Sequence, residues 1–204
     1  MNNKITVIRP RPKWQLINIR EILEFSELFY IFSWRDIKVR YKQTILGILW
    51  AILQPLLSMI IFTIFFGNFA KIPSDGLPYP VFVLLGLIFW GYFSSSLSRA
   101  STVFIDNENL IKKVYFPREI LLFSTVITAF IDFLISFFLF IIVALFYNIP
   151  FNFLFLSMVF LSILISALAS TGLGLLVASI NIKYRDVRYI IPFFLQLMIF
   201  ITPV

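Results

Sequence analysis

The chain has 204 residues, of which 60% are hydrophobic and 13% are charged, and its formal net charge is +7. A water-soluble domain has about 45–50% apolar and about 25% charged residues, so this composition excludes an ordinary soluble fold. The sequence contains no Cys and no His. It therefore excludes disulfides, thiolate metal sites and the usual general base near neutral pH.

Long apolar runs alternate with polar stretches along the chain. A spanning helix needs about 20 apolar residues to cross a hydrocarbon core of about 30 Å, and four runs are long enough. We therefore expect an all-α bundle of transmembrane helices that forms a single domain. Its expected segments are a cytoplasmic arm with an interface helix (1–43), span 1 (44–70), span 2 (79–97), a cytoplasmic loop (98–119), span 3 (120–147), span 4 (151–180), a second cytoplasmic loop (181–189) and the start of span 5 (190–204).

The basic residues predict the orientation of these spans. Of the 17 Lys and Arg residues, nine lie in residues 1–43, four in 98–119 and three in 181–189, whereas only Lys71 lies in an alternate loop. Cytoplasmic loops carry an excess of Lys and Arg, so we expect a cytoplasmic N-terminus. Because the charge lies next to the membrane, anionic lipid or a cytosolic protein is the expected partner, rather than nucleic acid.

The last apolar run is too short to cross a bilayer. At 1.5 Å per residue its roughly 15 residues cover about 22 Å. This segment is either re-entrant or the beginning of a truncated span. We favour truncation and expect the sequence to be the N-terminal portion of a longer protein.

The region before the first span has the pattern of an amphipathic helix. Apolar and acidic side chains recur there at helical spacing on opposite faces: Ile22, Phe25, Phe29 and Phe32 on one face, and Glu21, Glu24 and Glu27 on the other. We interpret this segment as a helix lying in the plane of the membrane surface. The alternative is a soluble amphipathic helix that packs on another protein.

Asp132 is the only acidic residue deep within a predicted span. Acidic residues inside a membrane usually face the bundle interior or a cavity. One hypothesis is that Asp132 lines a pathway for substrate. The other is that it makes a buried hydrogen bond between helices, with its carboxyl group protonated. The sequence does not decide between them.

Small residues recur every fourth position in the fourth predicted span. They are Ser166, Ser170, Gly174 and Ala178. This pattern allows two helix backbones to approach closely. We favour packing within the chain over a seam between two copies.

The loop before the third span predicts a short amphipathic helix. Asp106 or Asn107 can cap its N-terminus, and Pro117 ends it. We favour docking of this helix to a cytosolic subunit, and the alternative is a solvated basic loop that only sets topology. The residues assigned to this coupling or gate segment are Asn107, Glu108, Leu110, Ile111, Lys112, Lys113, Val114 and Tyr115.

Phe occurs 26 times. Aromatic rings can stack against the C–H faces of sugars, so some of them are candidates for lining a conduit, whereas others face lipid or fill the bundle. The channel-lining candidates are Trp50, Phe62, Phe65, Phe66 and Phe69, together with Asp132.

Motifs for chemistry are absent from the sequence. It has no phosphate-binding G-x-x-x-x-G-K-[ST] and no dinucleotide-binding G-x-G-x-x-G after a strand. No pairing of a nucleophile with a base is visible. We therefore predict no catalytic site, no metal site and no cofactor of its own, so any energy must come from a partner or a gradient.

Four segments keep a common order along the chain. They are RYKQTILGILWAILQP (40–55), LIKKVYFPREI (110–120), NIKYRDVR (181–188) and TPV (202–204). In these segments the chain resembles the membrane subunits of bacterial ABC polysaccharide exporters, which move O-antigen, teichoic acid or capsule.

The resemblance implies a six-span permease in the bacterial inner membrane, although the sixth span is absent from this sequence. It implies a homodimer that pairs with two cytosolic ATPase subunits, which bind the ATP. The implied substrate is a glycan linked to undecaprenyl pyrophosphate that moves through an aromatic-lined channel. Lys112, Lys113 and Arg118 are the residues expected to attract the pyrophosphate.

Three alternatives to polysaccharide export follow from the same residues. The first is an ABC exporter of a lipid or drug. The second is a channel or carrier that works without an ATPase, which predicts titratable pairs in the membrane, where this chain offers only Asp132. The third is a membrane scaffold without a substrate, which predicts no water-filled path.

Overall fold

The computed structural model describes residues 19–42, 49–71, 73–74 and 76–202. All regular structure in these residues is helical, as the sequence predicts. The elements are α1 (Ile19–Glu24), α2 (Ser26–Lys42), α3 (Leu49–Phe62), the π-helical segment η1 (Thr63–Phe69), α4 (Tyr79–Asp106), α5 (Glu108–Lys113), α6 (Glu119–Phe146), α7 (Phe153–Lys183) and α8 (Val187–Met198).

Four helices of the described chain are long and apolar enough to cross a membrane. They are Leu49–Phe69, Tyr79–Asp106, Glu119–Phe146 and Phe153–Lys183, which correspond to the four complete spans expected from the sequence. The shorter helix α8 is apolar and contains Pro192.

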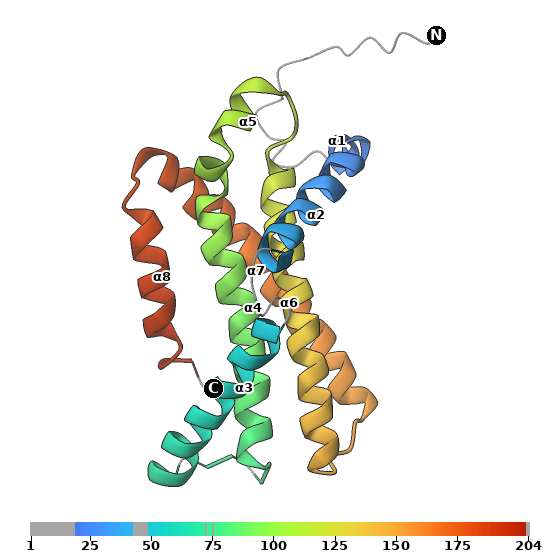
Figure 1. Cartoon of the computed structure of the whole chain (residues 1–204), viewed down its shortest axis with the longest axis vertical. Helices are drawn as coiled ribbons and strands as arrows, with labels where there is room; N and C mark the ends of the chain where they lie inside the picture. The colour runs from blue at the N-terminus through green and yellow to red at the C-terminus, as the bar shows by residue number, and fades with distance from the viewer. Residues whose placement is uncertain (1–18, 43–48, 72, 75, 203–204) are drawn as a thin grey trace.

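The helix α4 extends beyond the end of the second predicted span at Leu97 and reaches Asp106. The apolar run stops near Leu97, but no Gly or Pro interrupts residues 98–106, so the backbone remains helical. Loss of apolar character therefore marks the expected edge of the membrane and not the end of the helix. The short helix α5 stands at this end of the bundle, which we call the α5 end (Figure 1).

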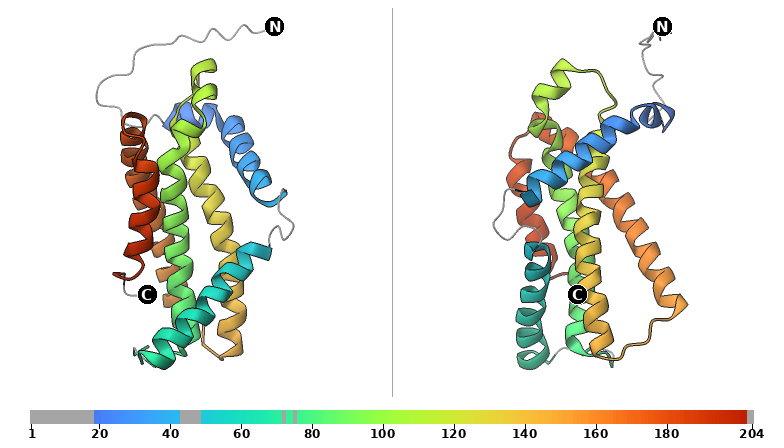
Figure 2. Two further views of the ribbon diagram at one scale, coloured as in Figure 1. Left: turned by 60° about the vertical axis from the view of Figure 1, so that its left-hand side comes forward. Right: turned by 45° about the vertical axis from the view of Figure 1, so that its right-hand side comes forward.

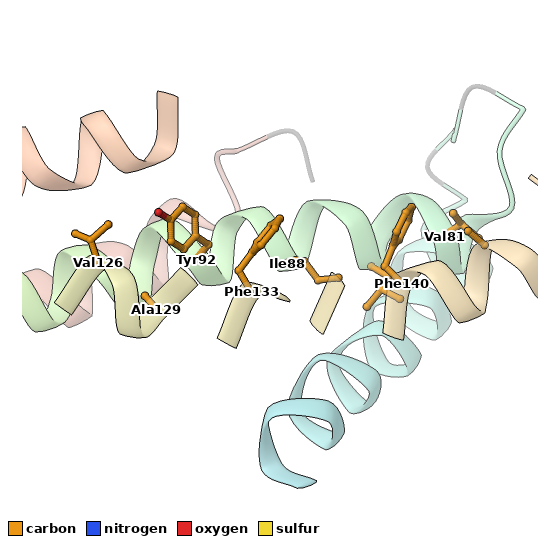
Figure 3. Packing of buried hydrophobic residues seen from close by; sticks show 9 residues of the cluster. Val81, Ile88, Tyr92, Val126, Ala129, Phe133 and Phe140 are labelled. Carbon is orange, nitrogen blue, oxygen red and sulfur yellow. The ribbon is translucent and has the colours of Figure 1, made fainter. Parts of the chain in front are cut away.

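The central helix of the bundle is α4, which packs against α3, α6, α7 and α8. Its contact with α6 forms the main core, where Tyr92 and Ile88 of α4 meet Phe133 and Ala129 of α6 (Figure 3). Aromatic rings continue the core along α6. Successive ring centroids lie 5.5 to 6.1 Å apart in the series Phe130, Phe133, Phe137, Phe140 and Phe155.

The helices α1 and α2 form an arm that crosses the outside of α6 near the α5 end (Figure 2). The predicted amphipathic helix is present, although it is interrupted at Phe25. Its apolar face packs within the same chain, where Phe32 forms a cluster with Phe116 and Ile120. On the outer side of α2, Tyr30 and Trp34 are exposed and their rings are stacked.

The small residues of α7 lie against α4. Ser170, Gly174 and Ala178 are buried, and a Cβ added at Gly174 would lie 2.7 Å from the Cβ of Ala100. The same seam ends at Asn181, whose buried side-chain amide donates a 2.7 Å hydrogen bond to the carbonyl oxygen of Ser101. The stripe therefore serves packing within the chain, as the sequence favoured.

We expect Gly174→Ala to lower the thermal unfolding temperature of the detergent-solubilised protein. The added methyl group would overlap Ala100, and overpacking of this kind costs about 1–3 kcal/mol. The control is Gly172→Ala in the same helix, because a Cβ there meets no atom within 4 Å. Replacing Gly by Ala favours a helix equally at both positions, so only the contact with α4 separates the variants. Equal melting temperatures would contradict the close approach.

Candidate functional site

A cavity of about 500 Å³ lies among α3, α4, α6 and α8, beside the end of α2. Apolar spanning helices form it, and its wall is mainly apolar, but several of these helices contribute polar side chains to it. The polar side chains that line it are Arg40, Gln54, Ser58, Trp90, Tyr92, Ser94, Ser95, Ser98, Asp132, Ser136 and Gln196. A space of this size with a largely apolar wall and several hydroxyl, amide and charged groups is suited to a ligand that has both polar groups and apolar surface.

Two of the lining serines bond through their hydroxyl groups to the backbone of their own helix, which helps them to occupy a spanning helix. Ser94 donates to the carbonyl oxygen of Gly91 at 3.3 Å, and Ser136 donates to that of Asp132 at 3.0 Å. Such local bonds satisfy the hydroxyl donor inside an apolar bundle. The oxygen atoms remain able to accept hydrogen bonds from a ligand.

Asp132 connects the cavity to the arm. The Tyr41 hydroxyl donates a hydrogen bond to one carboxylate oxygen of Asp132, and the Arg40 guanidinium forms an ion pair with the other. Both partners come from the last turn of α2, so this contact fixes the end of the arm to α6. Asp132 lines the cavity, as the pathway hypothesis requires. It also joins two helices, as the hypothesis of a buried contact between helices requires.

Burial raises the pKa of the Tyr41 hydroxyl well above its ordinary value, and the hydrogen bond to Asp132 raises that pKa further. Tyr41 therefore remains protonated at physiological pH. Its hydroxyl is a stable donor to the carboxylate, and the contact does not depend on a change in the charge of Tyr41.

The aromatic channel candidates lie away from this cavity. Trp50, Phe65 and Phe69 are exposed on α3 and η1, and 77% of the Phe69 surface is accessible. The rings of Phe62 and Phe66 lie 5.3 Å apart, and those of Phe65 and Phe69 lie 6.1 Å apart. Only Asp132 among the six candidates lines the cavity, and a channel role for the other five stays a prediction.

The cavity contains residues that sequence reasoning did not select. The sequence assigns no site role to Arg40, which lines the cavity, or to Tyr41, which bonds to Asp132, and both lie in the segment 40–55 that resembles the exporter family. The signals that were present are the serines at 94, 95 and 98 and the amides Gln54 and Gln196 inside apolar runs. Polar side chains of this kind within spans indicate helix contacts or a pathway.

The α5 end gathers the residues of the predicted coupling segment. α5 begins after Asn107 and ends at Lys113, before the predicted stop at Pro117, because Val114 is already extended. Asn107 precedes the helix without a side-chain cap; its amide donates instead to the carbonyl oxygen of Val103 at 2.9 Å. Lys112 donates a hydrogen bond to Glu108, which holds the pKa of that exposed carboxyl below its usual value.

The two faces of the coupling segment have different surroundings. Leu110 and Ile111 pack against the cluster around Phe32, whereas Lys112, Lys113, Val114 and Tyr115 are exposed. A pocket of about 260 Å³ lies on the outer side, and Lys112, Lys113 and Arg118 all line it. The structure thus brings the three predicted phosphate-attracting cations to one pocket.

The arm is bonded to the coupling segment at two points. Arg35 of α2 donates to the side-chain oxygen of Asn107 at 3.2 Å, and the Tyr115 hydroxyl donates to Glu21 of α1 at 3.1 Å. The rings of Phe32 and Phe116 add an apolar contact, with centroids 5.6 Å apart. A continuous series of contacts therefore leads from α5 along the arm to Asp132.

Comparison with known proteins gives a consistent assignment. Residues 27–204 match the family described as ABC-2 type transporter. The chain is 30% identical over 187 residues to the O-antigen export system permease protein RfbA of Myxococcus xanthus, which covers 91% of this chain and 70% of that protein. It is 27% identical over 178 residues to a Klebsiella pneumoniae protein of the same name, covering 87% and 68% of the two chains.

A protein named for polysialic acid transport is also similar. The polysialic acid transport protein KpsM of Escherichia coli is 28% identical over 172 residues, which covers 82% of this chain and 65% of that protein. The family match covers α2 from residue 27, the four long helices and α8, so it includes every element that forms the cavity. The family match over residues 27–204 and the similarity to RfbA together show that this chain belongs to the ABC-2 type transporter family of membrane proteins.

Proposed function

We propose that this chain is the permease subunit of an ABC transporter that exports a lipid-linked polysaccharide of the O-antigen type. The observation that carries the proposal is the cavity of about 500 Å³ among apolar spanning helices, with several polar side chains in its wall. Its hydroxyl and amide groups match the hydrogen-bonding groups of a sugar, and Trp90 offers a ring for stacking. Relatives named for O-antigen export and polysialic acid transport support the same substrate class.

The proposed subunit lies in the bacterial inner membrane with its N-terminus and its α5 end in the cytoplasm. The support is the distribution of basic residues, because Lys71 is the only basic residue of the described part of the chain at the opposite end of the bundle. We assign 1–43 to the cytoplasmic arm, 98–119 to the coupling loop and 190–204 to part of a fifth span. A six-span permease working as a homodimer is the proposed assembly.

The proposed energy source is a cytosolic ATPase subunit that binds ATP and docks on the coupling segment. The exposed side chains of Lys112, Lys113, Val114 and Tyr115 form a surface that such a subunit can reach. The arm would transmit a movement of the coupling segment to Asp132. At one end of the arm, Glu21 and Arg35 bond to the coupling segment. At the other end, Arg40 and Tyr41 bond to Asp132. The pocket with Lys112, Lys113 and Arg118 would attract the pyrophosphate of the substrate.

We expect Lys113→Glu to abolish co-purification of the permease with its ATPase subunit. The change reverses an exposed charge on the proposed docking surface and removes no contact within the permease. The matched control is Lys71→Glu, which makes the same change at the opposite end of the bundle. A full yield of ATPase with Lys113→Glu would reject the docking role.

We expect Tyr41→Phe to lower polysaccharide export while the ATPase remains bound. The variant loses only the hydroxyl group that donates to Asp132, and a hydrogen bond to a charged group contributes about 1.5–3 kcal/mol, which corresponds to an effect of about ten- to a hundredfold. Export is measured as surface polysaccharide in cells. Tyr30→Phe on the exposed side of α2 is the control, and equal export by both variants would contradict transmission through the arm.

We expect Ser95→Cys to react readily with a water-soluble maleimide, because Ser95 lines the cavity. The natural chain has no Cys, so a single introduced thiol reports one site. Ser124→Cys is the control, since Ser124 is buried and donates to Leu121 within α6. A membrane scaffold without a water-filled path predicts that neither thiol reacts, and that result would remove the cavity from the proposed mechanism.

A further inference from the structure

The corner of the cavity around Asp132 has more positive than negative charge. Arg40 forms an ion pair with Asp132, and Arg99 of α4 lies within electrostatic range of both groups. The nearby Asp36 accepts hydrogen bonds from Arg35 at 2.8 and 2.9 Å. Asp36 is also within electrostatic range of Arg99, so three guanidinium groups, those of Arg35, Arg40 and Arg99, share two carboxylates at this corner.

Arg99 is the group without a local partner. It is only partly exposed, and its guanidinium forms no hydrogen bond or ion pair with another residue in the described part of the chain. Arg99 is not among the residues that line the cavity, but Ser98 precedes it and Ser95 lies one turn earlier, and both serines line the cavity. Arg99 therefore lies at the edge of this corner. A partly buried cation without a paired anion is costly, so this corner favours an anionic ligand.

We infer that Arg40 and Arg99 bind the phosphate of a membrane-embedded lipid at this corner of the cavity. A guanidinium presents a planar fork of donors that matches phosphate oxygens, and the hydroxyl of Ser98 can supply a further donor. A ligand that reaches a site among spanning helices needs an apolar tail, and a lipid supplies one. The phosphate can come from a bilayer phospholipid or from the diphosphate of the exported lipid.

That the exported lipid is one source of the phosphate rests on the proposed function, but the binding of a lipid phosphate at this site does not. In a lipid-linked glycan the sugar is joined directly to the phosphate. With phosphate on Arg40 and Arg99, the first sugar would lie against Trp90, Gln54 and Gln196 in the same cavity. The phosphate would also compete with Asp132 for Arg40, so its arrival would loosen the hold of α2 on α6.

The test measures lipid binding by the purified permease–ATPase complex in phosphatidylcholine nanodiscs. The three probes are fluorescent forms of a polyprenyl diphosphate, phosphatidylglycerol and diacylglycerol, and diacylglycerol is the uncharged reference. We expect Arg99→Gln to weaken phosphate-lipid binding by about tenfold, because it removes one charge-assisted contact. The matched control is Arg188→Gln, which removes an exposed cation outside the cavity and should bind like the wild type.

Weakening of the polyprenyl diphosphate alone supports a site selective for the transported lipid. Weakening of phosphatidylglycerol as well supports a site that also accepts bilayer phospholipid. Wild-type binding of both phosphate lipids by Arg99→Gln overturns the inference, as does an equal loss for diacylglycerol.

Two further variants separate binding from folding. Arg99→Lys retains the charge and should bind more tightly than Arg99→Gln, and the melting temperatures of both show whether they fold. Asp132→Asn removes the competitor for Arg40 and should bind phosphate lipids several-fold more tightly than the wild type. Weaker binding by a folded Asp132→Asn would overturn the inference. Because binding is read directly, a complex that binds phosphate lipids but exports no polysaccharide would reject the proposed function and leave the site standing.

Discussion

A carboxylate in the middle of an apolar bundle must be paired, and much of the arrangement at the α5 end follows from this constraint. Leaving Asp132 alone in the bundle would cost several kcal/mol, and α6 itself offers no cation for it. Arg40 and Tyr41 supply the charge and the hydrogen bond from α2. The arm must therefore lie across α6 with its last turn beside the cavity, and its apolar face then covers Phe116 and Ile120.

The pairing also explains why a cavity with polar side chains persists in this bundle. Asp132 and Arg40 place charged groups at one end of the space, and serine and glutamine side chains add further polar groups to its wall along α3, α4, α6 and α8. The aromatic residues of α6 have the opposite role. Phe130, Phe133 and Phe137 stack along the α6 core and contribute apolar packing next to the cavity.

The sequence predicted the spans well because one physical variable, apolar length, decides them. It also predicted a short helix before Lys113 and the packing of Gly174, since helical spacing and small side chains are local patterns. The partners of Asp132 were beyond its reach. Residues 41 and 132 are distant in the chain and meet only after α2 folds back over α6. The cavity likewise takes its wall from several helices, and no single segment contains its pattern.

The close contact at Gly174 has a mechanical consequence. Where two backbones touch through Gly174 and Ala100, with Asn181 bonded to Ser101 at the end of the seam, sliding or tilting would force atoms to overlap. α4 and α7 are therefore expected to move together as one rigid unit. Any widening of the cavity would then come from α2, α3 and α8, which pack less extensively against this pair of helices.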